Sequence, residues 1–569
     1  MPPQAASDLA CDVLVVGSGA GGLATAITAR KRGLDVLVIE KEPFFGGTTA
    51  FSGGVLWVPG NPHAERAGLS DTREAARTYL RHEAGNAYDE AAVEAFLDAG
   101  PRMIEFFERE TEVKFVLSGY PDYHPDAPGG AKAGRSVTAA AFDARKLGRE
   151  IARLRPPLET ITFIGMMFNS SNEDLKHFFR ATRSLTSAAY VARRLARHLK
   201  DLAIHRRGVQ ITSGNALAAR LAKTAFDLGI PIRTGTAAES LSVSDGRVTG
   251  AVVRDAEGER RIAARRAVVL ACGGFPHDRE RVSEAYPHVK RGAEHLSPTP
   301  SGNTGDGIRL GEAAGGAFEI RMANAAAWMP VSRVPLGGGR TGVFPHLVDR
   351  YKPGVVAVNR HGRRFTNEAN SYHDTGAAMI RDGEGVDATA AWLICDHPTI
   401  RKYGLGYAKP APVPIGRYVR NGYLVSGRTL PELAQAAGID PDGLVATVDH
   451  YNRGAARGED PAFGRGSTAF NRFLGDAEHR PNPNVAPIVK GPFYALKLVM
   501  GDLGTFDGLR TDTVGRVLRP DAHPVAGLYA VGNDRASIMG GAYPGAGITL
   551  GPIMTFGFIT GHHLADEAA

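Results

Sequence analysis

Residues 12–40 read DVLVVGSGAGGLATAITARKRGLDVLVIE, and this stretch predicts the fold. A short β-branched apolar run typical of a buried strand leads through glycines into a helical pattern that stops at Gly33, and a second strand follows. A GxGxxG signature between a strand and a helix is typical of a nucleotide site. Its glycines let backbone amides approach a pyrophosphate, and the helix N-terminus stabilises the negative charge. Glu40 ends the second strand, where it can bind ribose hydroxyls. The alternative is a glycine-rich turn used only for tight packing.

A second cluster of glycines and hydroxyl side chains follows Glu40 in KEPFFGGTTAFSGG, residues 41–54. These residues imply further contacts along a cofactor longer than one nucleotide. An isoalloxazine ring offers such contacts through N5 and its pyrimidine edge, so we expect FAD rather than NAD. An ordinary loop of small polar residues is the alternative.

Size and composition narrow the class of protein. A chain of 569 residues predicts two or more domains, and its 70 glycines gather in GG and GxG runs that suit close approach to a large ligand. A net charge of +7 is modest for this length and does not indicate nucleic-acid binding. Three widely spaced cysteines indicate neither a disulfide framework nor a metal site. No secretion signal and no apolar run of about 20 residues is visible, so we expect a cytoplasmic protein.

With these motifs in place, the sequence resembles FAD-dependent flavoproteins of the fumarate reductase/succinate dehydrogenase type. Further segments match in order: RAVVLACGGF at 266–275, GNTGDG at 302–307 and GLYAVGN at 527–533. The resemblance implies an α/β fold with a discontinuous Rossmann-like FAD-binding domain, residues 1–330 and 490–569, and an inserted α+β substrate-capping domain, residues 331–489. The cofactor-binding residues that it implies are Gly17, Gly19, Ala20, Gly21, Gly22, Glu40, Lys41, Gly46, Gly47, Thr48, Thr49, Ser52, Gly53, Gly54, Ala238, Gly273, Gly274, Gly532, Asn533, Ile548 and Leu550. No histidine lies in a convincing attachment context, so we expect FAD to be held non-covalently.

The C-terminal run AVGNDRASIMGGAYPGAGITLGP, residues 530–552, narrows the resemblance. Its YPGAG segment is similar to the YPGxG element of the 3-ketosteroid Δ1-dehydrogenases, which implies that Tyr543 and Gly547 lie in the active site. HGRRFTNEANSY, residues 361–372, is similar to the family segment that ends in a catalytic tyrosine, here Tyr372. GYPDYHPDAPGG, residues 119–130, is similar to the YxDYxP loop, with Tyr123 as the active-site tyrosine and Tyr120 as the alternative.

The resemblance also implies a mechanism, which introduces a double bond beside a ring ketone. The Tyr543 hydroxyl and the Gly547 N–H would hydrogen-bond the keto oxygen, Tyr372 would take the α proton, and FAD N5 would accept the hydride. Because a free tyrosine has a pKa near 10, we expect a hydrogen bond from Tyr123 to lower the pKa of Tyr372.

Other functions stay open. The chain is longer than the steroid enzymes around residues 155–210, and Arg535 and the Gly540-Gly541 pair flank Tyr543 without a match in that family. These departures count against a steroid as the substrate. A smaller cyclic ketone, such as a cyclohexanone derivative, with a carboxylate near Arg535 would use the same mechanism. A reductase of an enone or a fumarate-like acid and a non-catalytic flavin-binding protein are the remaining alternatives.

A basic segment at 176–207 contains an apolar stripe at helical spacing, formed by Val191, Leu195, Leu199 and Leu202. One interpretation is a helix on a membrane surface, with a quinone as the electron acceptor and membrane contact at most peripheral. The other is a core stripe with a solvated basic face.

Overall fold

The structure is a computed structural model that describes residues 9–167, 177–178, 180–181, 184–384 and 389–566. The strands β1 (Leu9–Val16) and β2 (Val36–Glu40) are parallel, with Val13 opposite Val36, and α1 (Ala20–Lys31) connects them. The predicted strand–helix–strand unit is therefore present, and its glycines form the turn before α1.

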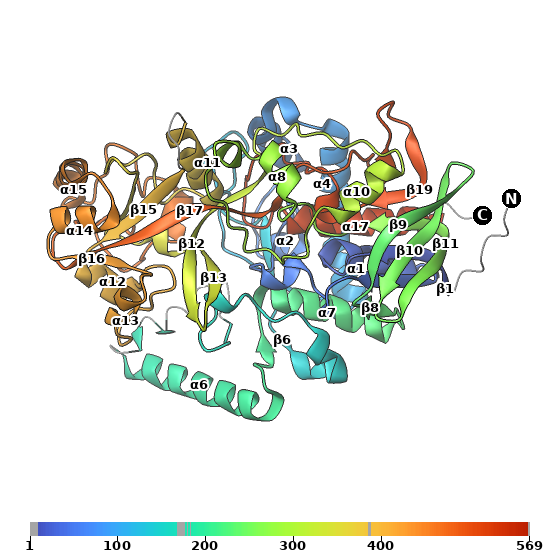
Figure 1. The fold of residues 1–569 in the computed structure, drawn as a ribbon, viewed down its shortest axis with the longest axis horizontal. Helices are drawn as coiled ribbons and strands as arrows, with labels where there is room; N and C mark the ends of the chain where they lie inside the picture. The colour runs from blue at the N-terminus through green and yellow to red at the C-terminus, as the bar shows by residue number, and fades with distance from the viewer. Residues whose placement is uncertain (1–8, 168–176, 179, 182–183, 385–388, 567–569) are drawn as a thin grey trace.

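This unit belongs to a sheet whose strand order is β18-β19-β10-β11-β1-β2-β8, with β9 paired to β10. Its other strands are β8 (Ile232–Thr234), β9 (Ala237–Ser244), β10 (Arg247–Asp255), β11 (Gly258–Leu270), β18 (Arg516–Leu518) and β19 (Pro524–Ala530). The parallel pairing of β19 with β11 brings a C-terminal strand into the sheet that β1 starts. The helices α17 (Leu550–Asp566) and α7 (Ser213–Asp227) pack against α1. In Figure 1 the red α17 lies beside the blue α1, at the right of the molecule.

A second sheet lies at the opposite end of the molecule, at the left of Figure 1, with the strand order β13-β12-β17-β15-β14. Its strands are β12 (Ala326–Gly337), β13 (Arg340–Pro345), β14 (Val355–Val358), β15 (Ala390–Cys395) and β17 (Phe493–Thr505), and β16 (Val425–Gly427) pairs with β17. The helices of this part are α11 (Tyr372–Asp382), α12 (His397–Tyr403), α13 (Gly416–Arg420), α14 (Leu430–Ala437), α15 (Pro441–Ala455) and α16 (Ala469–Phe473). The strand β12 begins before residue 331, and β17 lies wholly after residue 489 although it belongs to the second sheet. The division of domains at these residues stays a prediction.

A small sheet, β3-β5-β4, supports the loop that contains Tyr123. Its strands are β3 (Val55–Trp57), β4 (Phe115–Leu117) and β5 (Ser136–Ala139), and the neighbouring helices are α2 (Pro62–Arg66), α3 (Arg73–Ala84) and α4 (Glu90–Glu110). The buried Trp57 indole donates to Asp122 at 2.8 Å, and the buried Arg135 guanidinium pairs with the same carboxylate at 2.8 Å. Because both charges are buried and mutually paired, they fix the loop without leaving an unpaired ion in the core.

Short elements complete the chain. They are β6 (Phe142–Asp143), β7 (Gln210–Ile211), α8 (Arg279–Ala285), α9 (Pro287–Lys290), α10 (Asp306–Ala313) and the 3-10 helices η1 (Thr48–Phe51), η2 (Gly85–Ala87), η3 (Ala144–Arg153), η4 (Glu159–Ile161), η5 (Asp349–Tyr351) and η6 (Gly532–Asp534).

The basic segment forms α6 (Leu185–His205), which runs along the lower edge of the molecule in Figure 1. The basic residues Lys176 and Arg183 of this segment lie outside the described residues. Across the described chain, none of the helices combines the length and the apolar character needed to cross a bilayer.

Candidate active site

A cavity of about 900 Å³ is lined by residues from both sheets and from both ends of the chain. Of the cofactor-binding residues expected from the sequence, those that line it are Gly17, Gly19, Ala20, Gly21, Gly22, Glu40, Lys41, Gly47, Thr48, Thr49, Ser52, Gly53, Gly54, Ala238, Gly273, Gly532, Asn533 and Leu550. Gly46, Gly274 and Ile548 are not among the lining residues. The Gly46 N–H donates to Ser18 Oγ, the Gly274 N–H donates to Asp534 Oδ1, and Ile548 packs in an apolar cluster with Trp57.

The turn before α1 fits a pyrophosphate. Gly17 has φ +113°, and a Cβ at this position would lie 2.1 Å from the Ala271 carbonyl oxygen, so only glycine fits. The first turn of α1 contains no acidic side chain, and its N-cap Gly19 offers no capping side chain. The Ala20 N–H donates to Thr49 Oγ1 at 3.0 Å, so the amides of Gly21 and Gly22 and the positive end of the helix dipole are left for an anion.

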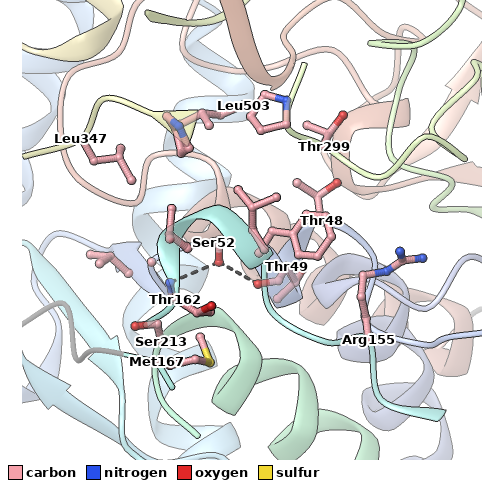
Figure 2. A pocket seen from close by; sticks show the side chains of 18 of the residues that line it. Thr48, Thr49, Ser52, Arg155, Thr162, Met167, Ser213, Thr299, Leu347 and Leu503 are labelled. Atoms are coloured by element: carbon pink, nitrogen blue, oxygen red, sulfur yellow. Dashed lines mark hydrogen bonds between the residues drawn. The ribbon is translucent and has the colours of Figure 1, made fainter. Parts of the chain in front are cut away.

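Polar side chains fix the walls of this part of the cavity. Glu40 accepts hydrogen bonds from the Ser18 hydroxyl at 2.6 Å and from the Glu42 N–H at 3.0 Å, which holds its carboxylate at the end of β2. Ser52 Oγ donates to the Thr49 carbonyl at 2.8 Å and accepts from the Gly54 N–H at 3.1 Å (Figure 2). The shape and donor groups of this region fit a dinucleotide cofactor.

Two further polar residues at this site were missed by the sequence reasoning. Asn303 lines the cavity and donates to Thr48 Oγ1 at 2.8 Å. The buried Asp534 accepts hydrogen bonds from the backbone N–H groups of Cys272 and Gly274, and burial raises its pKa to about 6. Asn303 lies inside the quoted GNTGDG loop and Asp534 directly follows GLYAVGN, so their place beside these motifs was the available signal.

The expected tyrosines meet at another part of the cavity. The hydroxyls of Tyr123 and Tyr372 are 3.3 Å apart. The Tyr543 ring is stacked on Tyr123 with centroids 5.6 Å apart, and its centroid is 5.0 Å from that of Tyr372. All three side chains are buried and line the cavity. Tyr120 also lines it but packs against Phe473, so Tyr123 is the tyrosine of this loop that contacts the other two.

Different elements position each tyrosine. Tyr372 is the first residue of α11, whose N-cap Ser371 accepts a hydrogen bond from the Asp374 N–H. Tyr543 lies in the loop before α17, and the carbonyl of the following Pro544 accepts hydrogen bonds from the Tyr123 N–H at 2.8 Å and the Tyr79 hydroxyl at 2.6 Å. The loops of Tyr123 and Tyr543 are therefore joined directly through the backbone.

Gly547 lies in the same C-terminal loop and lines the cavity. Its φ is +95°, and a Cβ would lie 2.5 Å from the Val55 carbonyl oxygen, so the backbone here requires glycine. Its carbonyl accepts from the Trp57 N–H at 3.0 Å, whereas its own N–H has no acceptor among the described residues. A cavity-lining N–H of this kind can donate to a ligand oxygen.

The expected lowering of the Tyr372 pKa is wrong. Burial, with smaller contributions from Tyr123 and Tyr543, raises the pKa of Tyr372 well above its ordinary value. Burial, with smaller contributions from Tyr543 and Tyr351, raises the pKa of Tyr123 well above its ordinary value against the opposing hydrogen bond with Tyr372, and burial raises the pKa of Tyr543. All three phenols are therefore neutral near pH 7, and the polar groups among them are hydroxyls rather than charges.

A charged cluster behind the tyrosines was also missed. His124 follows Tyr123, and its Nε2 lies 3.0 Å from Asp374 Oδ2 while its Nδ1 lies 2.8 Å from Glu83 Oε2. Burial opposes the charged imidazolium, but the two carboxylates outweigh it and raise the pKa of His124 to about 10. The ionised histidine therefore ties the Tyr123 loop to the start of α11. The available signal in the sequence was that His124 directly follows Tyr123 and that Asp374 lies two residues after Tyr372.

The structure does not support the expectation that a carboxylate of the substrate lies near Arg535. Arg535 is buried, does not line the cavity, and lies over the Phe556 ring. Burial lowers its pKa to about 10. The lysines that line the cavity are Lys41, whose ammonium pairs with Asp306, together with Lys352 and Lys409 in the second sheet's part of the molecule.

Comparison with known proteins places the chain among flavoproteins, because residues 12–550 match the family model described as an FAD binding domain. The chain belongs to this family. It is 45% identical to a 4-oxocyclohex-2-ene-1-carboxylate 5-dehydrogenase of Sinomonas cyclohexanicum, covering 99% of this chain and 95% of the relative. It is 39% identical to a 3-oxosteroid 1-dehydrogenase of Mycobacterium tuberculosis, covering 98% of each. The FAD-binding fold and cofactor predicted from the sequence are thus confirmed, and the flavoprotein is an FAD-dependent oxidoreductase that acts on CH–CH bonds.

A solved structure agrees with this family. The 3-ketosteroid Δ1-dehydrogenase of Sterolibacterium denitrificans, in complex with 1,4-androstadiene-3,17-dione, matches with a TM-score of 0.89 and 35% identity over 98% of this chain and 100% of that chain. The resemblance to these dehydrogenases, inferred from three short motifs, therefore extends over the whole described fold.

Proposed function

We propose that this flavoprotein introduces a double bond beside the carbonyl of a ring ketone through the buried tyrosines Tyr123, Tyr372 and Tyr543. The observation that carries the proposal is their meeting at one cavity that the nucleotide-binding turn also lines. When bound, FAD supplies the acceptor for the hydride that leaves the β carbon. The remaining steps belong to side chains and backbone groups of this chain.

Polarisation of the ketone is the first of these steps. The Tyr543 hydroxyl and the Gly547 N–H would donate to the keto oxygen and stabilise the negative charge that develops as the α proton leaves. Two observations support this role: Gly547 lines the cavity, and its N–H has no acceptor among the described residues.

Removal of the α proton is assigned to Tyr372. Its high pKa makes the phenolate a strong base once formed, but keeps the phenolate scarce near neutral pH. The Tyr123 hydroxyl donates to the Tyr372 oxygen at 3.3 Å and so fixes the orientation of that phenol, while the net effect of Tyr123 on the pKa of Tyr372 is to raise it. Neutral hydroxyls suit this buried site because an unpaired cation would be costly there.

The two kinds of relative support a ring ketone as the substrate. One is named for a keto acid with a single ring and the other for a 3-oxosteroid, and both substrates carry a ketone in a six-membered ring. We infer that the same chemistry operates here.

An anaerobic screen of ring ketones tests the proposal. The holoenzyme is mixed with 4-oxocyclohexane-1-carboxylate, 4-methylcyclohexanone and a 3-oxo-4-ene steroid, and the flavin absorbance near 450 nm is followed. The proposal predicts bleaching by at least one ketone, with the unsaturated ketone as product. No bleaching by any of them, with reoxidation of chemically reduced flavin by fumarate or an enone acid, would indicate a reductase instead. A yellow protein that reacts with none of these compounds would indicate a flavin-binding protein without catalysis.

We further infer that a quinone reoxidises the flavin and that the protein contacts a membrane only peripherally, from the cytoplasm. The helix α6 supports this inference, because Val191 and Leu195 line the cavity while other apolar side chains of the same helix face outward, where a membrane surface could bind them. These are Leu185, Leu199 and Ile204, which are 91%, 57% and 61% exposed.

Flotation with anionic liposomes at low and high salt tests the membrane contact, and stopped-flow reoxidation of the flavin by a short-chain menaquinone tests the electron acceptor. If the protein is absent from the vesicle fraction at low salt, the proposed membrane contact is refuted. If the quinone does not reoxidise the reduced flavin, the proposed electron acceptor is refuted.

A further inference from the structure

Two lysines line the cavity in the part formed by the second sheet and its loops, and they differ in their partners. The Lys352 ammonium donates to the carbonyls of Leu474 and Gly475 at 2.8 and 2.9 Å, so its position is fixed by the backbone. The Lys409 ammonium has neither a hydrogen bond nor an ion pair among the described residues. Of these two lysines, Lys409 is therefore the one whose ammonium can donate all of its hydrogen bonds to a ligand in the cavity.

The surroundings of Lys409 disfavour an unpaired charge. Its Nζ lies 5.2 Å from the Tyr407 ring centroid and 6.0 Å from that of Phe344. Burial, with repulsion from Arg417, lowers the pKa of Lys409 to about 8. These contacts place a cation against apolar walls, where an anion from solution would be its natural partner.

Asp349 is the acid that attracts Lys409, and one of its two oxygens, Oδ1, has no hydrogen-bond partner among the described residues. Asp349 accepts a hydrogen bond from the Gly406 N–H at 2.8 Å, and His346 Nδ1 lies 2.7 Å from the same carboxylate oxygen. Arg417, which donates to the Tyr418 hydroxyl, adds a second positive charge on the same side. Lys409 is thus repelled by Arg417 and attracted by Asp349, with which it forms no ion pair.

Apolar side chains connect this lysine with the tyrosines. The Tyr123 ring lies 4.4 Å from that of Phe470, which lies 5.8 Å from the ring of Tyr351 in η5. The Gly406 N–H bond to Asp349, in the same short helix, brings the segment 404–413 against η5. Phe344, Leu347, Tyr351 and Leu474 line the same cavity as the tyrosines and Lys409, and their apolar surface suits the hydrocarbon body of a ring substrate.

We propose that Lys409 binds a carboxylate on the substrate, at the end of the ring ketone remote from the carbonyl, and so makes the enzyme selective for keto acids. This inference rests on the proposed function, because the ketone must lie at Tyr543 for the acid to lie toward Lys409. It assigns a specificity-determining role to a residue that takes no part in proton or hydride transfer.

Calorimetric binding of unreactive ligands tests the role of Lys409 independently of turnover. Two matched pairs are compared on the holoenzyme: 4-hydroxybenzoate with its methyl ester, and 3-oxo-1,4-pregnadiene-20-carboxylate with its methyl ester. The first pair spans one ring and the second a steroid. We expect the acid of at least one pair to bind more tightly than its ester. Lys409→Met should reduce that preference about 10- to 100-fold, the range typical of a hydrogen bond to a charged group. Lys409→Arg should keep most of it.

Two control variants separate this role from others. Lys497→Met removes an exposed lysine of β17 outside the cavity and should leave the preference unchanged. Lys352→Met tests the second lysine. The proposal is overturned if neither acid binds better than its ester, if Lys409→Met keeps the preference, or if Lys352→Met alone abolishes it. A preference for the acids that depends on Lys409, with no bleaching by any ketone, would instead refute the proposed function and leave Lys409 as a carboxylate site only.

Discussion

Tyr372 combines a buried position with a phenol pKa well above its ordinary value, because burial and two neighbouring phenols disfavour its phenolate. A base with such a pKa is mostly protonated at neutral pH. We therefore expect the rate of flavin bleaching by a saturating ring ketone to rise as the pH increases from 6 to 9. Stopped-flow measurements across this range check it. A rate independent of pH would contradict a titrating phenol as the base, provided that substrate binding stays saturated.

Tyr543 donates to the keto oxygen in this account, and its loss should slow the chemical step without removing the base. We expect Tyr543→Phe to lower kcat about 10²- to 10³-fold, the usual cost of one oxyanion donor. Steady-state kinetics with an artificial electron acceptor give this number. The control is Tyr451→Phe, because Tyr451 is buried outside the cavity and its hydroxyl has no hydrogen-bond partner among the described residues. Equal loss in both variants would show that the effect is one of packing.

At the scale of elements, the contact between His124 and Asp374 joins the Tyr123 loop to α11. The pKa of His124 is raised to about 10, above the 6.5 of an unfolded histidine. The stability that this charge contributes is therefore fully present below pH 6.5 and is lost as the pH rises through about 10. Because the side chain is 39% exposed, we expect it to contribute only about 1 kcal/mol.

Denaturation of the wild type and of His124→Gln at pH 6 and at pH 10.5 checks this expectation. The difference in the free energy of unfolding should be largest at pH 6 and close to zero at pH 10.5. A difference that stays constant between the two values would mean that the imidazolium charge is not responsible. Activity should fall as well, since the variant frees the loop that carries Tyr123.

The strand–helix–strand unit was predictable because its signals are local. The pattern from residue 12 to residue 40 contains both strands, the turn and the acid. The contact between Tyr123 and Tyr372 joins residues 249 positions apart, and it could be expected only through the resemblance of their motifs. Arg535 shows what the sequence alone cannot predict. It lies close in sequence to cavity-lining residues, but its side chain lies over the Phe556 ring instead of in the cavity. Lys409 gave no signal, since its environment depends on how the segment 404–413 packs against η5.

At the scale of the whole molecule, residues from both ends of the chain line the cofactor region, and β19 pairs with β11 in the sheet that begins with β1. A ligand bound there stabilises the folded chain by mass action, by about 2.7 kcal/mol at a concentration 100 times its Kd. We therefore expect Tm to rise when FAD is added to the protein from which it has been removed. Thermal unfolding followed by circular dichroism at several FAD concentrations measures this. A Tm that does not depend on FAD would contradict the non-covalent, bridging site described above.

The gathering of Tyr123, Tyr372 and Tyr543 in one cavity is the central claim, and a single turnover tests it most directly. The holoenzyme, Tyr372→Phe and the control Tyr451→Phe are each mixed anaerobically with a ring ketone that bleaches the wild-type flavin, and the rate of the absorbance loss is recorded. General base catalysis typically contributes 10²- to 10⁴-fold, so Tyr372→Phe should bleach slower by about this factor, while Tyr451→Phe follows the wild type. Bleaching of Tyr372→Phe at the wild-type rate, with normal flavin content, would contradict the claim.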